Sequence, residues 1–196
     1  TRALKLTAGK CTVLAGTGSN CTQKTLEASS RASEAGVDGL LVVTPYYNKP
    51  SQSGLIKHYT TLAEKVDRPI VLYNVPGRTA VSMTPSTVAE LGAHRQIVGI
   101  KEASGNLVLF GEMRREFYLK NPDKEFFWFS GDDPTYWPFL GCGGSGVISV
   151  ASNVLPNAMK KLHEYFMHSD FSSGCRLHED LLNLFTDLFI EPNPVP

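Results

Sequence analysis

Two residues that could do chemistry stand at the ends of short apolar segments. Lys101 follows Ile97-Val-Gly-Ile, and Tyr73 follows Pro69-Ile-Val-Leu. Both segments are typical of β-strands that are buried on two faces, where an unpaired ammonium is costly. Desolvation lowers the pKa of a lysine, and its neutral amine can attack a ketone to form an imine. A phenol at the end of the preceding strand could carry protons to and from the carbinolamine oxygen.

Each of these residues also has an ordinary structural explanation. Lys101 could extend into solvent from the end of its strand and pair with Glu102. Tyr73 could be a core tyrosine whose hydroxyl is bonded to the backbone. Arg78 follows in a Pro-Gly turn, where its guanidinium could bind a carboxylate in bidentate fashion or could simply be solvated. Taken one at a time, these residues leave both explanations open.

Three other patterns carry weaker signals. Gly16-Thr-Gly18 resembles a phosphate-binding loop but lacks a third glycine and a Gly-Lys-Ser/Thr ending, so a nucleotide-binding α/β module is a less favoured hypothesis. Asp132 and Asp133 could bind a metal, but no His or Glu follows at ligand spacing, and we expect Asp133 to cap the next helix. We expect surface positions for the histidines, which are His58, His94, His163, His168 and His178.

The bulk composition is typical of one soluble globular domain with a small-molecule partner. The 196 residues include 19 Lys plus Arg and 19 Asp plus Glu, a balance that disfavours nucleic acid and anionic membranes as partners. The four cysteines show no C-x-x-C spacing, which argues against zinc and disulfides and fits a reducing cytoplasm. Because the chain starts at Thr1 and stops in a proline-rich run at Pro196, we expect a fragment or a trimmed chain.

Six short apolar segments recur at intervals of 20 to 30 residues, and helical patterns separate them. This alternation predicts parallel βα units with both faces of the sheet covered. Periodicity alone does not choose between part of an eight-stranded barrel and an open doubly wound sheet. The segments begin at Thr12, Gly39, Pro69, Ile97, Phe126 and Gly146.

The intervening helices have clear start and stop signals. A helix over about residues 22–34 is expected to end at Gly36, because glycine readily adopts the left-handed conformation that terminates helices. Thr84-Pro85 predicts an N-cap followed by proline at the first helical position, and Gly92 is expected to end that helix. Apolar residues at helical spacing over about residues 156–189 predict two further helices.

Five motifs together resemble the dihydrodipicolinate synthase family, and their order and spacing match over nearly the whole chain. The resemblance implies a (β/α)₈ TIM barrel, present as a partial barrel with strands 3 to 8 in residues 1–155. Residues 156–196 would then form the final barrel helix and the start of a C-terminal helical region. The motifs are Thr44-Pro-Tyr-Tyr-Asn48, Tyr73-Asn-Val-Pro-Gly-Arg-Thr79, Gly99-Ile-Lys-Glu-Ala-Ser-Gly105, Ser130-Gly-Asp-Asp133 and Gly146-Val-Ile-Ser-Val150.

The resemblance implies a Schiff-base lyase that condenses pyruvate with L-aspartate 4-semialdehyde to give 4-hydroxy-tetrahydrodipicolinate, in lysine and diaminopimelate biosynthesis. Lys101 would hold pyruvate as an imine, with neither a separate cofactor nor a metal. Tyr73 would be the general acid and base, and Tyr47 would join the proton relay of a neighbouring subunit. Arg78 would bind the semialdehyde's carboxylate. Ile148, through its carbonyl, and Gly131 would contact substrate.

Regulation and assembly are also implied by the resemblance. Asn20 and Tyr46 match positions of a possible allosteric lysine site, although Lys24 stands where lysine-sensitive members often carry an acidic residue. A cytoplasmic homo-oligomer, either a dimer or a tetramer, is expected. The alternatives are a related pyruvate aldolase, such as N-acetylneuraminate lyase or a 2-keto-3-deoxy sugar acid or 4-hydroxy-2-oxoglutarate aldolase, or an inactive fragment or subunit. Such a subunit would need another chain to complete its barrel, because the family's first two strands have no counterpart before Thr1.

Overall fold

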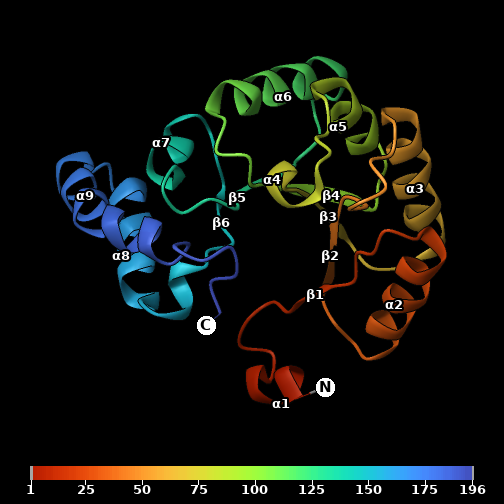
Figure 1. Ribbon diagram of the computed structural model, residues 1–196, viewed down its shortest axis with the longest axis horizontal. Coiled ribbons are helices and arrows are strands. Elements are labelled where there is room, and N and C mark those ends of the chain that lie inside the picture. The colour runs from red at the N-terminus through yellow and green to blue at the C-terminus, as the bar shows by residue number, and fades with distance from the viewer. Residues whose placement is uncertain (1, 196) are drawn as a thin grey trace.

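Six parallel strands form one curved sheet whose spatial order follows the order of the chain, β1-β2-β3-β4-β5-β6 (Figure 1). The computed structural model describes residues 2–195. Sequential order excludes the doubly wound alternative, in which the strand order reverses at a switch point. The sheet is therefore part of a barrel wall, as predicted. The strands are β1 Leu14–Gly16, β2 Gly39–Val43, β3 Ile70–Asn74, β4 Ile97–Glu102, β5 Phe127–Ser130 and β6 Gly146–Val147.

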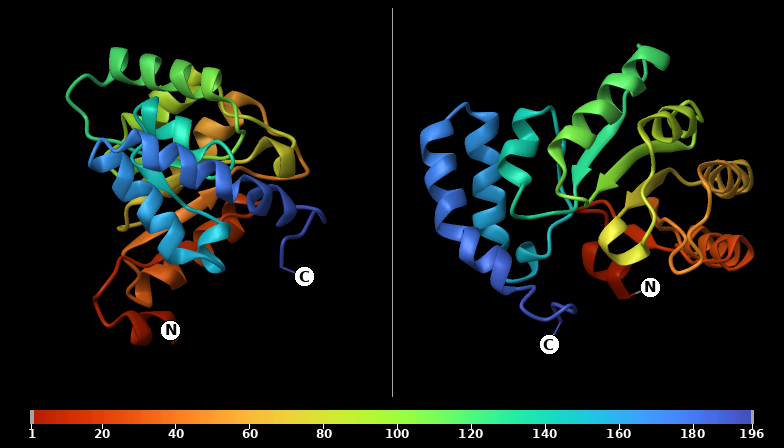
Figure 2. Two further views of the ribbon diagram at one scale, coloured as in Figure 1. Left: turned by 90° about the vertical axis from the view of Figure 1, so that its left-hand side faces the viewer. Right: turned by 45° about the horizontal axis from the view of Figure 1, so that its top comes forward.

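Helices follow the strands and cover the outer face of the sheet, while the last two pack side by side at one end of it (Figure 2). The predicted helix after β1 has the predicted bounds, and the two expected C-terminal helices are present. The helices are α1 Arg2–Thr7, α2 Thr22–Glu34, α3 Gln52–Lys65, α4 Pro76–Thr79, α5 Pro85–Gly92, α6 Leu107–Lys120, α7 Tyr136–Gly141, α8 Pro156–Met167 and α9 Phe171–Asp187, with a 3₁₀ turn, η1, at Ala151–Asn153.

One helix cap was predicted correctly and one was not. The Thr84 hydroxyl accepts the Thr87 N–H at the start of α5. Asp133, however, does not cap α7, which begins at Tyr136 without a side-chain cap. Its carboxylate Oδ2 instead accepts the backbone N–H groups of Val150 and Ala151, at 2.9 and 2.8 Å. A buried carboxylate that meets two free N–H groups of another turn is better satisfied there than at a local cap.

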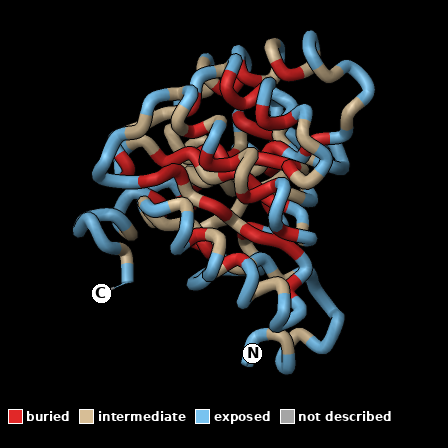
Figure 3. The backbone as a smooth tube through the Cα atoms, turned by 90° about the vertical axis from the view of Figure 1, so that its right-hand side faces the viewer, coloured by how far each residue is buried: buried red, intermediate tan, exposed pale blue. Residues whose placement is uncertain are grey.

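The main hydrophobic core lies between the outer face of the sheet and the helices (Figure 3). Side chains of successive strand residues point to opposite faces. Leu40, Leu72 and Ile100 point outward into this core and are fully buried. The inner face is more open: Leu14 is 37% exposed and Phe127 is 50% exposed. A second core cluster joins α7 to α8 and α9.

The prediction that the histidines lie at the surface is wrong for His58. This side chain is 5% exposed, and its Nδ1 lies 2.9 Å from the hydroxyl of Thr22. It is buried because α3 packs against α2. All four cysteines are exposed. Among residues 2–195, no helix combines the length and the hydrophobicity that a membrane span requires.

Candidate active site

Lys101 and Tyr73 face each other on the inner side of the sheet. They are register partners at the carboxyl ends of β4 and β3, and the Lys101 Nζ lies 4.3 Å from the centroid of the Tyr73 ring. Lys101 is 8% exposed. Burial lowers the pKa of its ammonium, and the negative charge of Asp133 opposes this shift. The alternative in which Lys101 extends into solvent is therefore wrong.

The phenol of Tyr73 experiences two opposing effects. Burial raises its pKa, and the positive charge of Arg78 partly offsets the increase. A phenol whose pKa lies above 10 is protonated at neutral pH, so it can donate a proton before it accepts one. The pair thus combines an amine that loses its proton more easily than an ordinary lysine with a phenol that retains its proton.

Gly131 leaves the space that the Lys101 side chain occupies. A Cβ atom at this position would lie 2.6 Å from Lys101 Cε and 2.6 Å from the Cβ of Ala103. The Gly131 N–H donates to the Glu102 carbonyl at 2.7 Å, which holds the turn after β5 against the end of β4. The residue was predicted to contact substrate, and the structure adds that it accommodates the lysine.

A cavity of about 490 Å³ opens at this end of the sheet. Arg78 lies in the short helix α4 rather than in the expected loop. Its Nη2 donates to the carbonyl of Pro192 at 2.8 Å, and its Cζ is 5.9 Å from the centroid of the Phe189 ring. The chain after α9 therefore holds this guanidinium beside the cavity. The lining residues are Gly16, Gly18, Leu41, Val43, Tyr46, Tyr73, Val75, Arg78 and Thr79.

The other predicted site residues are dispersed. Tyr47 is 89% exposed and has a φ of 73°, whereas its neighbour Tyr46 lines the cavity. Asn20 lies near the same loop, because its carbonyl accepts the side-chain amide of Asn48 at 3.0 Å. Ile148 lines a different, largely apolar cavity of about 510 Å³ on the inner face, together with Val71, Phe127 and Phe129.

Sequence reasoning missed two features of this site. Asp133, predicted as a helix cap, is a buried carboxylate that influences Lys101 electrostatically. Glu102 was considered only as a surface partner of Lys101, but it is 3% exposed and accepts the side-chain amide of Asn74 at 3.0 Å. The alternation of strand side chains could have indicated that Glu102 and Lys101 point to opposite faces.

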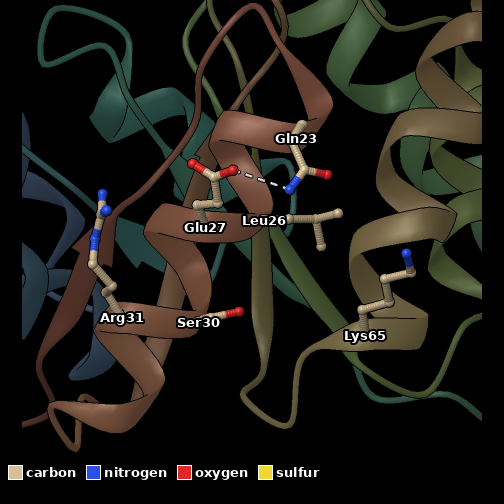
Figure 4. Close-up of a pocket in the computed structure, with 6 residues that line it drawn as sticks. All are labelled: Gln23, Leu26, Glu27, Ser30, Arg31 and Lys65. Atoms are coloured by element: carbon tan, nitrogen blue, oxygen red, sulfur yellow. Dashed lines mark hydrogen bonds between the residues drawn. The ribbon is translucent and has the colours of Figure 1, made fainter.

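A further hollow, of about 500 Å³, lies away from this site between α2 and α3 (Figure 4). Across it from Lys65 of α3, Gln23 and Glu27 of α2 bond to each other at 3.0 Å. Because it lies between two helices of the outer layer, this groove does not reach Lys101. Within residues 2–195, no group of three or more His, Cys, Asp or Glu side chains is arranged to hold a metal ion.

Comparisons with known proteins agree on one family. The family model described as Dihydrodipicolinate synthetase family matches residues 1–196. A 4-hydroxy-tetrahydrodipicolinate synthase of Geobacter sulfurreducens is 48% identical over 184 residues, which are 94% of this chain and 62% of the relative. The crystal structure of dihydrodipicolinate synthase from Thermotoga maritima superimposes with a TM-score of 0.95 at 41% identity, covering 100% of this chain and 66% of that one.

Another similar solved structure is a complex with pyruvate. It is the dihydrodipicolinate synthase of Acinetobacter baumannii, described as chloride inhibited and complexed with pyruvate, and it superimposes with a TM-score of 0.91 at 37% identity. The match covers 98% of this chain and 65% of that one. The chain therefore spans slightly less than two thirds of the length of these relatives.

Proposed function

Because the chain belongs to the dihydrodipicolinate synthetase family, we propose that its protein is a 4-hydroxy-tetrahydrodipicolinate synthase, a lyase that condenses pyruvate with L-aspartate 4-semialdehyde. The observation that carries the proposal is the buried Lys101 amine, 4.3 Å from the centroid of the Tyr73 ring at the carboxyl ends of adjacent strands. Active sites of TIM barrels lie at this end of the strands. The relative from A. baumannii binds pyruvate, which supports pyruvate as the first substrate.

The reaction begins when the neutral Lys101 amine attacks the keto carbon of pyruvate. Tyr73 donates a proton to the oxygen, and the carbinolamine then loses water to leave an imine on Nζ. Loss of a methyl proton converts the imine into an enamine, whose carbon attacks the aldehyde of the semialdehyde. The amino group of the second substrate then displaces Lys101 and closes the ring. The covalent imine takes the place of a separate cofactor.

Arg78 is proposed to recognise the second substrate through its carboxylate. In the structure its guanidinium donates to the Pro192 carbonyl, a neutral acceptor. A carboxylate carries a full negative charge and two acceptor oxygens that match the guanidinium fork, whereas the neutral carbonyl accepts a single bond. An incoming carboxylate can therefore displace the carbonyl, while Arg78 stays next to the cavity that Tyr73 also lines.

Assembly and regulation complete the proposal. Tyr47, which is 89% exposed on its loop, would reach the site of a neighbouring subunit in a homo-oligomer, either a dimer or a tetramer. Tyr46 and Asn20 would contribute to a lysine-binding site. The proposed location is the cytoplasm. Residues 1–155 are proposed as the partial barrel, and residues 156–196 as the final barrel helix and the start of a C-terminal helical region.

The test is to trap the imine. Incubation with pyruvate and sodium borohydride should add a stable mass to the peptide that contains Lys101, and Lys101→Arg should abolish the adduct, since a guanidinium does not form the imine. Lys124 is the matched control, because it is a second partly buried lysine whose pKa is lowered by burial. Lys124→Arg should label like the wild type. Labelling that persists in Lys101→Arg would disprove the assignment.

A further inference from the structure

The two strands that carry Tyr73 and Lys101 are joined by a second pair of side chains on the opposite face of the sheet. Asn74 and Glu102 are the next register partners along β3 and β4. Both are buried, with exposed fractions of 0% and 3%. The Asn74 Nδ2 donates to Glu102 Oε1 at 3.0 Å. The Asn74–Glu102 pair on the outer face thus lies directly behind the Tyr73–Lys101 pair on the inner face.

The carboxylate of Glu102 also holds the chain that leaves β4. Ser104 donates to it through its backbone N–H, at 3.1 and 3.2 Å to the two oxygens, and through its hydroxyl at 2.9 Å. Burial raises the pKa of this carboxyl group, and the hydrogen bonds from Ser104 and Asn74 oppose the increase because they stabilise the ionised form. The carboxylate therefore fixes both the neighbouring strand and the turn that follows Lys101.

Asn74 extends the connection to the segment that carries Arg78. Its Oδ1 accepts the N–H of Met83 at 3.0 Å, and its Nδ2 lies 3.4 Å from the hydroxyl of Ser82. Helix α4, with Arg78, is the chain between these anchor points. Gln52 secures the same segment from α3, since its Nε2 donates to the Ser82 carbonyl at 2.8 Å. The segment is thus fixed at both of its ends.

We propose that Asn74 and Glu102 are positioning residues, whose hydrogen-bonded pair on the outer face sets the spacing between Tyr73 and Lys101 on the inner face and anchors the segment bearing Arg78. The inference rests on the proposed function. Packing alone leaves a strand pair free to shift slightly, whereas a buried donor and acceptor must stay in register to remain satisfied. Neither residue touches the reacting atoms.

The positioning role can be tested by exchanging the amide of Asn74 and the carboxylate of Glu102 between the two strands. In Glu102→Gln one amide oxygen must serve both the Asn74 amide and Ser104, and the new NH₂ group faces a donor. In Asn74→Asp two carboxylates face each other. In the double variant, the new carboxylate on β3 can accept from both Met83 and the new amide on β4, whose oxygen accepts from Ser104. The donor and acceptor pattern is then restored with the two groups exchanged.

The measurement is the rate of imine formation at Lys101 with pyruvate, quenched with borohydride at timed intervals and read by mass spectrometry, with thermal melting in parallel. Each single substitution should slow trapping about tenfold, as expected for a small displacement of reacting groups. The double variant should return to within about threefold of the wild type. Asn121→Asp is the matched control, because Asn121 donates to backbone carbonyls in the outer layer. Asn121→Asp should lower the melting temperature. It should not change the rate at which the folded protein traps the imine at Lys101.

The outcomes separate this inference from the proposed function. If wild-type Lys101 traps no pyruvate, both are overturned. If the wild type traps pyruvate and both single variants do so at the same rate, only the positioning role is overturned. A double variant as slow as the singles would overturn the role of the pair as well. Should Asn74→Asp fail to fold, the comparison of Glu102→Gln with the double variant decides the question alone.

Discussion

Replacing Gly131 with alanine should displace Lys101 and suppress imine formation. The added methyl carbon would lie 2.6 Å from Lys101 Cε and 2.6 Å from Ala103 Cβ. Carbon atoms in good contact are about 3.5–4.0 Å apart, so the lysine stem must move by about 1 Å. Ala103 has little freedom to move away, because its N–H donates to the Asn74 carbonyl at 2.8 Å.

Two effects of different size follow from this displacement. Overpacking of a filled site costs about 1–3 kcal/mol of folding free energy. A misplacement of a reacting group by about 1 Å can reduce the rate about 100-fold. Gly131→Ala should therefore remain folded with a lowered melting temperature, while the rate of borohydride trapping on Lys101 falls by about two orders of magnitude.

The matched control is a glycine with open space around it. A Cβ atom at Gly111 in α6 would meet nothing within 4 Å, and alanine is favoured over glycine inside a helix by about 1 kcal/mol. Gly111→Ala should thus stabilise the protein slightly and trap pyruvate at the wild-type rate. If Gly131→Ala traps pyruvate as fast as Gly111→Ala does, the close approach of Gly131 to Lys101 does not determine the position of the Lys101 amine, and the reasoning is refuted.

Three further predictions concern the charged groups. Because burial lowers the Lys101 pKa, the unfolded state binds more protons between the folded pKa and the ordinary value near 10.5. The free energy of unfolding should therefore rise with pH in that window, an increase that denaturant titrations should find missing in Lys101→Met. Burial lowers the pKa of His58 to about 4 from 6.5. The free energy of unfolding should therefore fall by up to about 3 kcal/mol as the pH drops from about 6.5 towards 4. In urea titrations, His58→Asn should lack this acid sensitivity. Arg78→Lys should raise KM for the semialdehyde about tenfold in steady-state kinetics, because an ammonium lacks the bidentate fork, and unchanged KM would refute carboxylate recognition.

The sequence was sufficient to predict most of the elements and to place Lys101 and Tyr73 at the same end of adjacent strands. Lys101 and Tyr73 were identified because polar groups at the ends of apolar strands are costly unless they serve a purpose. Helices with local signals, such as the Thr84 cap, also lie where predicted. The helix predictions succeeded because they depend on neighbours in the chain, and the sequence displays those neighbours directly.

The failures concern residues whose partners are distant in the chain. Asp133 satisfies N–H groups 17 and 18 residues away instead of capping the next helix. His58 is buried through contact with Thr22, 36 residues earlier. Local patterns assign such side chains to caps or to the surface, because the partner that makes burial favourable becomes adjacent only in the folded chain. The chemical roles of all the predicted site residues stay predictions. Tyr73 and Arg78 line the cavity of about 490 Å³, whereas Lys101, Tyr47 and Ile148 do not.

The register of β3 and β4 explains why two dipeptides carry so much of the site. Tyr73 pairs with Lys101, and Asn74 pairs with Glu102. Since neighbouring side chains on a strand point to opposite faces, one dipeptide on each strand supplies an inner group that can react and an outer group that holds the strands in register. A shift by one residue would exchange the two faces and place the carboxylate inside. Selecting the register through a buried amide and carboxylate therefore also selects which side of the sheet presents the amine.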